Sequence, residues 1–139
     1  MTAIVGSGRN VRPLRILVAE DDASMRSWLA DVLRRDGHEV IEARNGAELL
    51  LRIREADRVD VVVTDVRMPA MSGLDAIACL NEAAVGVPVV VVTAFGDDET
   101  HRTAERFGAI VVLDKPFGAP ALRAALARAI SGDAKADEM

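Results

Sequence analysis

The chain has 139 residues, of which 50% are hydrophobic and 28% charged, with a formal net charge of -5. This length fits one globular domain, and the acidic balance argues against a domain held on nucleic acid by phosphate neutralisation. The apolar runs, such as Val87–Val92, are far shorter than the roughly 20 residues that cross a bilayer, and the start lacks the pattern of a signal peptide. The single cysteine, Cys79, allows no internal disulfide and fits a reducing cytoplasm.

Short runs rich in β-branched residues alternate with amphipathic stretches along most of the chain. Residues 1–13 show no sustained period, and we interpret them as a flexible leader. The expected strands are Arg15–Glu20, Glu39–Ala43, Asp60–Thr64, Val87–Thr93 and Ile110–Leu113. The third and fourth of these are almost continuously apolar, which is typical of parallel strands that are covered on both faces.

Five amphipathic segments with recognisable ends follow the strands. The first carries an apolar stripe that includes Trp28 and ends before Gly37, and the fourth spans about Asp98–Phe107. The second and third begin with capping pairs, Asn45 with Glu48 and Ser72 with Asp75, and the fifth runs from about Pro120 to Ile130. Five strands alternating with five helices predict an α/β fold, a doubly wound (βα)5 parallel sheet. We expect this domain to span residues 14–131, followed by a polar tail over residues 132–139.

Polar residues follow four of the predicted strands, and ligands of such sheets bind beyond the carboxyl ends of the strands. These residues are Glu20, Asp21 and Asp22, then Asp65, then Thr93, then Lys115. If the first and third strands are neighbours, their carboxylates converge and repel one another unless they bind a proton or a cation. Oxygen ligands of this kind suit Mg²⁺. Carboxylates, Mg²⁺, a hydroxyl and an ammonium together are what phosphoryl transfer requires.

Four segments of the sequence resemble, in order and spacing, the signatures of the response-regulator receiver domain of two-component signalling, as found in chemotaxis regulators. They are LVAEDDASMR, VVVTDVRMPAMSGLDAI, VVVTAFG and LDKPF. The resemblance covers about residues 14–130. It implies a flavodoxin-like sheet with the strand order 2-1-3-4-5.

The resemblance implies a role for each residue at the strand ends. Asp65 would be the phosphoacceptor, whose carboxylate attacks a phosphohistidine and becomes an acyl phosphate. Thr93 would hydrogen-bond one phosphoryl oxygen and move inward, and Lys115 would pair with another oxygen. The ligands of Mg²⁺ would be Glu20 through a bound water, Asp21, Asp65 and the backbone carbonyl of Arg67.

Each of these residues also has a structural interpretation when it is taken alone. Glu20 and Asp21 can belong to a solvated loop at the positive end of the first helix, for which Asp22 is the expected N-cap. Asp65 can be a turn residue, and Thr93 an ordinary β-branched strand residue. Lys115 can be an exposed lysine, although the chain has only one other lysine, Lys135. The prediction of a phosphoryl-transfer site would be wrong only if all of these structural interpretations were correct at once.

Three positions near the site affect the switch and the lifetime of a phosphoryl group. Val112 stands three residues before the lysine, where the family usually has an aromatic ring, so the movement of Thr93 is expected to be read through backbone shifts. Arg67 and Phe95 stand two residues past Asp65 and Thr93, beside the route of the attacking water in receivers. The bulky Phe95 therefore predicts slow loss of phosphate. The resemblance also implies a cis Lys115–Pro116 bond, which costs little before a proline.

The leading prediction is a cytoplasmic, bacterial-type receiver that is not an enzyme and is phosphorylated on Asp65 by a sensor histidine kinase or a histidine phosphotransfer protein. The face of the fourth helix, fifth strand and fifth helix would then switch binding to a downstream protein or output domain, and could pair two copies. The segment itself is expected to bind neither nucleic acid nor membrane. Both a complete single-domain regulator and the receiver part of a longer chain fit the sequence.

Two alternatives come from other classes of protein. A Mg²⁺-dependent phosphatase with an aspartate nucleophile, of the haloacid dehalogenase type, would also use a strand-end Asp, Thr and Lys. That family needs a second acid where Arg67 stands, which disfavours it. The other alternative is a pseudo-receiver, a binding module that never takes a phosphoryl group, which the full set of site residues disfavours.

Overall fold

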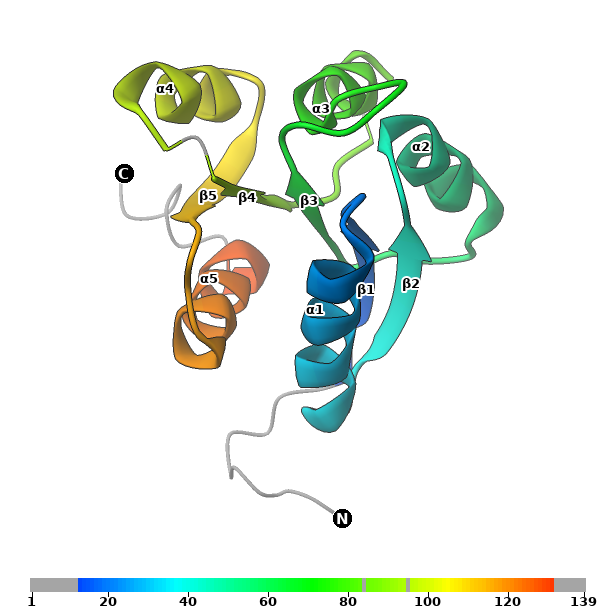
Figure 1. Cartoon of the computed structure of the whole chain (residues 1–139). Helices are drawn as coiled ribbons and strands as arrows, with labels where there is room; N and C mark the ends of the chain where they lie inside the picture. Colours follow the sequence, from blue (N-terminus) through cyan, green and yellow to red (C-terminus); the bar gives the residue numbers. More distant parts are fainter. Residues whose placement is uncertain (1–12, 84, 95, 132–139) are drawn as a thin grey trace.

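The computed structural model describes residues 13–83, 85–94 and 96–131, so the expected tail, all but the last residue of the expected leader, and Phe95 lie outside the described residues. Strands and helices alternate along the described chain (Figure 1). In order they are β1 Arg15–Ala19, α1 Ala23–Arg35, β2 Glu39–Ala43, α2 Gly46–Glu55, β3 Val61–Asp65, α3 Gly73–Glu82, β4 Val89–Thr93, α4 Asp98–Arg106, β5 Ala109–Asp114 and α5 Ala119–Ser131.

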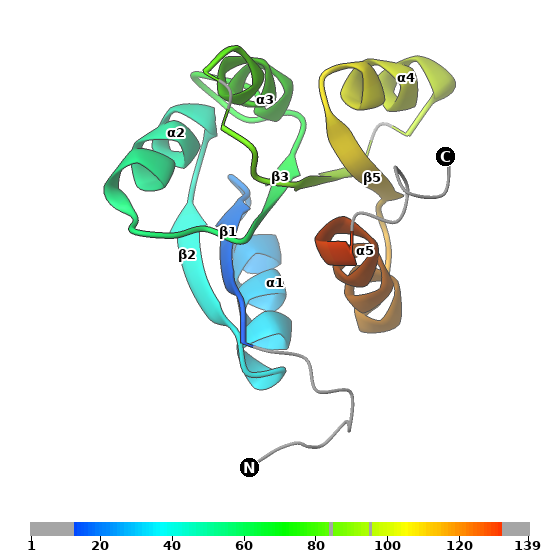
Figure 2. The same cartoon turned by 180° about the vertical axis from the view of Figure 1, so that it is seen from behind.

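The five strands form one parallel sheet in the order β2-β1-β3-β4-β5, which confirms the predicted fold class and strand order. Helices α1 and α5 cover one face, and α2, α3 and α4 cover the other, as both views show (Figures 1 and 2). Consecutive strands β1 and β2 lie side by side, and the chain then crosses back over β1 to start β3. The carboxyl ends of β1 and β3 therefore meet at one edge of the sheet.

The two central strands β3 and β4 are buried at every position, which explains their uninterrupted apolar sequences. Side chains of β3 alternate between the two faces. Val61 and Val63 pack with Leu29 of α1 and Leu122 of α5, whereas Val62 packs in the cluster that holds Ile77 of α3. Apolar side chains thus cover both faces of the sheet. Polar site residues are therefore expected at the ends of the strands.

Several element ends differ by one or two residues from the sequence prediction. The strand expected from Val87 begins at Val89, because Pro88 has no N–H to donate to a ladder, although its carbonyl accepts from the N–H of Val62. The first strand ends at Ala19, so Glu20 lies just beyond the strand.

Helix N-caps were predicted well from local sequence. The side chains of Asp22, Asn45 and Ser72 accept from backbone N–H groups three residues later, at 3.1, 2.8 and 3.1 Å. The predicted caps are therefore confirmed, including that of Asp22. Trp28 packs against the core of its face and meets the ring of Phe117 edge to face, as its place on the apolar stripe predicts. Within the part of the chain that the structure describes, no helix has the length and apolarity to cross a bilayer.

Candidate functional site

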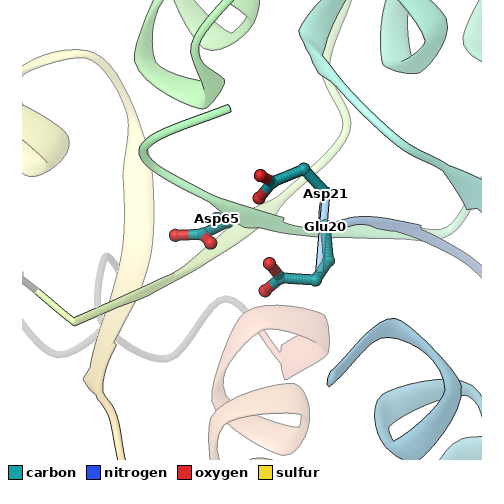
Figure 3. Close-up of side chains that lie close together, drawn as sticks. All are labelled: Glu20, Asp21 and Asp65. Carbon is teal, nitrogen blue, oxygen red and sulfur yellow. The ribbon is translucent and has the colours of Figure 1, made fainter. Parts of the chain in front are cut away.

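Three carboxylates gather at the carboxyl ends of β1 and β3 (Figure 3). Glu20 and Asp21 follow β1 directly, and Asp65 is the last residue of β3. Because β1 and β3 are paired up to Ala19 and Thr64, the acids that follow are brought together. One oxygen of each carboxylate lies within 4.8 Å of an oxygen of the others. Glu20 and Asp65 are buried, whereas Asp21 is exposed.

Glu20 is the most constrained of the three acids. Its Oε1 accepts from Lys115 Nζ at 3.0 Å, and its Oε2 accepts from the backbone N–H of Asp22 at 3.2 Å. The pKa of Glu20 is raised to about 7, chiefly by burial and in part by the neighbouring Asp65, against the opposing effect of the hydrogen bond from Lys115. The group therefore binds a proton or a cation readily near neutral pH.

Lys115 bridges two of the acids from the loop after β5. Its Nζ donates to Glu20 Oε1 and to Asp65 Oδ2, each at 3.0 Å. Burial alone would lower the pKa of Lys115, but the hydrogen bonds to both carboxylates outweigh it and the pKa is raised. The backbone N–H of Lys115 donates to the carbonyl of Thr93 at 2.8 Å, and the Lys115–Pro116 bond is cis, as expected from the sequence.

Asp65 is held at both carboxylate oxygens. Oδ1 accepts from the N–H of Val66 at 2.7 Å, and Oδ2 accepts from Lys115. The chain then turns back so that the N–H of Gly73 donates to the carbonyl of Val66 at 2.9 Å. A Cβ on Gly73 would lie 1.9 Å from the carbonyl oxygen of Asp65, so only glycine permits this close approach.

The remaining predicted residues lie around this group. Thr93 is buried at the end of β4, next to β3 in the sheet, and Arg67 is exposed in the loop after Asp65. Val112 is half-buried and packs in the cluster that contains Ala104 of α4. The structure thus brings together Glu20, Asp21, Asp65 and Lys115 through contacts that can be measured. Phe95 lies outside the described residues.

The sequence analysis missed Arg26, a residue of α1. Its Nη1 donates to the backbone carbonyl of Glu20 at 2.8 Å, and its Nε donates to Glu42 Oε1 at 3.3 Å. One signal was available in the sequence. Arg26 lies near the start of α1, and the first turn of that helix has no acidic residue, although the helix dipole favours acids over cations at this end.

The donor set fits a hard divalent cation. Mg²⁺ takes oxygen ligands at about 2.0–2.1 Å in an octahedron, so ligand oxygens lie roughly 3–4 Å apart. The spacing of the three carboxylates is close to that range, and small side-chain movements would complete it. A cation would also relieve the mutual repulsion of Glu20 and Asp65 that contributes to the raised pKa of Glu20.

Residues 16–127 match the family model described as the response regulator receiver domain. The chain belongs to this family. The receiver is accordingly a signalling domain of the two-component type, and its fold is the one that the family shares.

The curated relatives of this receiver include transcriptional regulators. The transcriptional regulatory protein PdtaR of Mycobacterium tuberculosis is 38% identical over 120 residues, which cover 86% of this chain and 58% of that protein. The transcriptional regulatory protein GlrR of Escherichia coli is 32% identical over 127 residues, which cover 91% of this chain and 28% of that protein. The receiver therefore spans about half, or less, of the length of these relatives.

Solved receivers superpose closely on the described fold. A response regulator receiver domain protein from Clostridium thermocellum has a TM-score of 0.78 at 30% identity, covering 86% of this chain and 96% of that one. The chemotaxis protein CheY4 of Vibrio cholerae has a TM-score of 0.79 at 28% identity, covering 85% and 99%. The match covers almost the full length of each of these two solved chains.

Proposed function

We propose that this receiver is a phosphoacceptor that takes a phosphoryl group from a phosphohistidine onto Asp65. The donor is a sensor histidine kinase or a histidine phosphotransfer protein. The observation that carries the proposal is the bridge from Lys115 Nζ to Asp65 Oδ2 and Glu20 Oε1, both at 3.0 Å, beside the exposed Asp21. It sets a nucleophilic carboxylate between a fixed positive charge and a set of cation ligands.

The transfer itself is a displacement at phosphorus. A carboxylate oxygen of Asp65 forms a bond to phosphorus while the P–N bond to the imidazole breaks, and the imidazole leaves with the electron pair of that bond. A bound Mg²⁺ supplies positive charge for the phosphoryl oxygens. Glu20, Asp21, Asp65 and the backbone carbonyl of Arg67 are the groups that would hold the ion.

Lys115 and Thr93 handle the oxygens of the transferred group in this proposal. The ammonium of Lys115 already touches Asp65, so it can shift to a phosphoryl oxygen without a change in the loop that carries it. The hydroxyl of Thr93 donates to a second oxygen and moves inward as it does so. The N–H of Val66 keeps the Asp65 carboxylate in one orientation during the attack.

The readout in this proposal is a shift between two arrangements of the α4-β5-α5 face. Thr93 ends β4 and precedes the loop to α4, and its carbonyl is tied to the N–H of Lys115. With Val112 packed beside α4, the movement passes through backbone and helix position instead of an aromatic ring. The face would bind a downstream protein, an output domain or a second copy of the chain, in the cytoplasm.

The test is incubation of the chain with a small phosphodonor and Mg²⁺, followed by intact mass measurement. Wild type should gain one phosphoryl group, Asp65→Asn should gain none, and Asp31→Asn, which changes an exposed acid of α1, should match wild type. Absence of an adduct on wild type would favour the pseudo-receiver. Repeated turnover of a phosphate ester would favour the phosphatase.

A further inference from the structure

We propose that Arg26 is a positioning residue for the acidic pair Glu20 and Asp21, because its guanidinium fixes the peptide that joins them. The inference rests on the proposed Mg²⁺ site and extends it to a side chain that touches neither the cation nor the phosphoryl group. Through Arg26, helix α1 sets the position at which the loop after β1 presents its carboxylates.

All four hydrogen-bonding parts of Glu20 have partners. The β1 strand ends at Ala19, so the backbone of Glu20 has left the strand and needs other partners. Its N–H donates to the carbonyl of Ala43 at 3.0 Å, and its carbonyl accepts from Arg26 Nη1 at 2.8 Å. Its carboxylate oxygens accept from Lys115 and from the N–H of Asp22. Of these partners, only Arg26 reaches the carbonyl, which belongs to the same peptide as the N–H of Asp21.

Arg26 is itself held from the other side. Its Nε donates to Glu42 Oε1 at 3.3 Å, and Glu42 Oε2 meets Arg34 Nη2 at 3.2 Å. The side chain of Arg26 is only 16% exposed, whereas those of Glu42 and Arg34 are 36% and 48% exposed. The guanidinium thus lies between Glu42 of the edge strand β2 and the Glu20 carbonyl, and it is hydrogen-bonded at both Nε and Nη1.

The positive charge of Arg26 does not favour cation binding, so any gain in Mg²⁺ affinity from Arg26 must come from the position that it gives the ligands. The N–H of Arg26 donates to the carbonyl of Asp22, the N-cap, so the residue lies one turn into α1, where a cation opposes the helix dipole. A positive charge beside the acidic pair also opposes binding of a cation. If charge alone mattered, removal of Arg26 would tighten Mg²⁺ binding, whereas a positioning role predicts that removal weakens it.

The experiment compares Mg²⁺ affinity of the full chain by titration of backbone NMR shifts. Arg26→Met keeps the apolar stem and removes every donor, and it should raise the dissociation constant roughly tenfold, the loss typical of an outer-shell partner. Phosphorylation by a small donor at saturating Mg²⁺ should stay near the wild-type rate. The substitution would then lower the affinity for Mg²⁺ without lowering the maximal rate. Arg26→Lys keeps a single cationic donor group, which cannot contact Glu20 and Glu42 with the guanidinium geometry, and should recover part of the affinity.

The matched control is Arg34→Met, which removes the other arginine on Glu42 and leaves the contact of Arg26 with Glu20 in place. Its Mg²⁺ affinity should stay within about twofold of wild type, because Arg34 contacts Glu42 and the Val40 carbonyl and does not hold the peptide between Glu20 and Asp21. Glu42→Gln should weaken binding in the wild-type background and add nothing to Arg26→Met. Thermal unfolding without metal checks that each variant is folded.

The outcomes separate this inference from the proposed function. If wild type binds Mg²⁺, Asp21→Asn does not, and Arg26→Met binds as tightly as wild type or more tightly, the positioning role is overturned and the metal site stands. An equal loss in Arg34→Met would also overturn it, because the effect would then run through Glu42 alone. If wild type itself binds no Mg²⁺, both this inference and the metal site fail.

Discussion

His101 Nε2 lies 2.8 Å from Asp114 Oδ1, and this contact joins the middle of α4 to the last residue of β5. The same carboxylate lies against the loop before α4, since a Cβ on Gly96 would be 1.9 Å from Asp114 Oδ1. Asp114 and Val112 are two residues apart and point to the same face of β5. On this face of β5 the chain therefore has Val112 and, two residues later, a polar contact from Asp114 to α4.

We expect His101→Ala to loosen α4 without unfolding the domain. A partly exposed pair of this kind stabilises by about 0.2–1 kcal/mol, which corresponds to a fall of up to about fivefold in protection of local amides. Hydrogen exchange by mass spectrometry should show faster exchange in peptides from α4 and no change in α2. Unchanged exchange in α4 would mean that apolar packing alone holds the helix.

The contribution of His38 to the stability of the domain should be lost at mildly acidic pH. The N–H of Leu14 donates to His38 Nδ1 at 3.0 Å, which requires a neutral ring, and burial lowers the pKa of His38 against an opposing effect of Asp36. The unfolded chain therefore takes up the proton first. The contribution of His38 is complete above its ordinary pKa of about 6.5 and is lost as the pH falls below it.

His38→Asn tests this prediction, because an amide oxygen can replace the ring nitrogen as acceptor and does not titrate. Urea unfolding between pH 5 and pH 8 should show that wild type loses stability relative to the variant as the pH falls below about 6.5. Carboxylates contribute equally to both proteins, so the difference isolates His38. Equal slopes in the two proteins would contradict the prediction.

Glu20→Gln should stabilise the metal-free domain near pH 8. Burial raises the pKa of Glu20 to about 7, so the folded state holds its proton more tightly than the unfolded state does. Wild type therefore loses stability as the pH rises from about 4.5 to 7, by roughly 3 kcal/mol, and the glutamine variant does not.

The measurement is urea unfolding in a chelator, at pH 4.5 and pH 8, followed by the same series with Mg²⁺. The gain of the variant should be present at pH 8 and absent at pH 4.5, and Mg²⁺ should stabilise wild type more than the variant. A variant that is less stable than wild type at pH 8 without metal would show that the hydrogen bond with Lys115 outweighs the cost of burying the charge.

Phe95→Glu should speed the loss of phosphate from Asp65. The resemblance to receivers implies that a bulky residue at this position shields the acyl phosphate from water, so an acid there should speed hydrolysis. A gain of three- to tenfold corresponds to roughly 0.7–1.4 kcal/mol of barrier. Decay of the phosphorylated chain after removal of the donor measures the rate. Phe95→Leu keeps an apolar side chain and should stay near wild type.

Local features were predictable from the sequence, and long-range side-chain contacts were not. The caps at Asn45 and Ser72 depend on residues three positions apart, and the runs in β3 and β4 follow from burial on both faces. The convergence of Glu20, Asp21 and Asp65 depended on the first and third strands being neighbours, which the resemblance to receivers implied and the structure confirms. These features need no knowledge of how side chains pack.

The contacts of Arg26 with Glu20 and of His101 with Asp114 depend on how helices sit on the sheet. Hydrophobic periodicity places a helix face but does not say which polar group a long side chain reaches from its edge. The end of β1 one residue before Glu20 was missed for a similar reason, because hydropathy does not mark where a ladder stops.

Lys115 carries one of only two lysine amines in the chain, and the other, Lys135, belongs to the C-terminal residues outside the described structure. The Nζ of Lys115 is hydrogen-bonded to two carboxylates, so it should react with acylating reagents more slowly than a fully solvated amine does. Amine coupling to a dye or a sensor surface under mild conditions should therefore spare Lys115 and leave the acidic site intact.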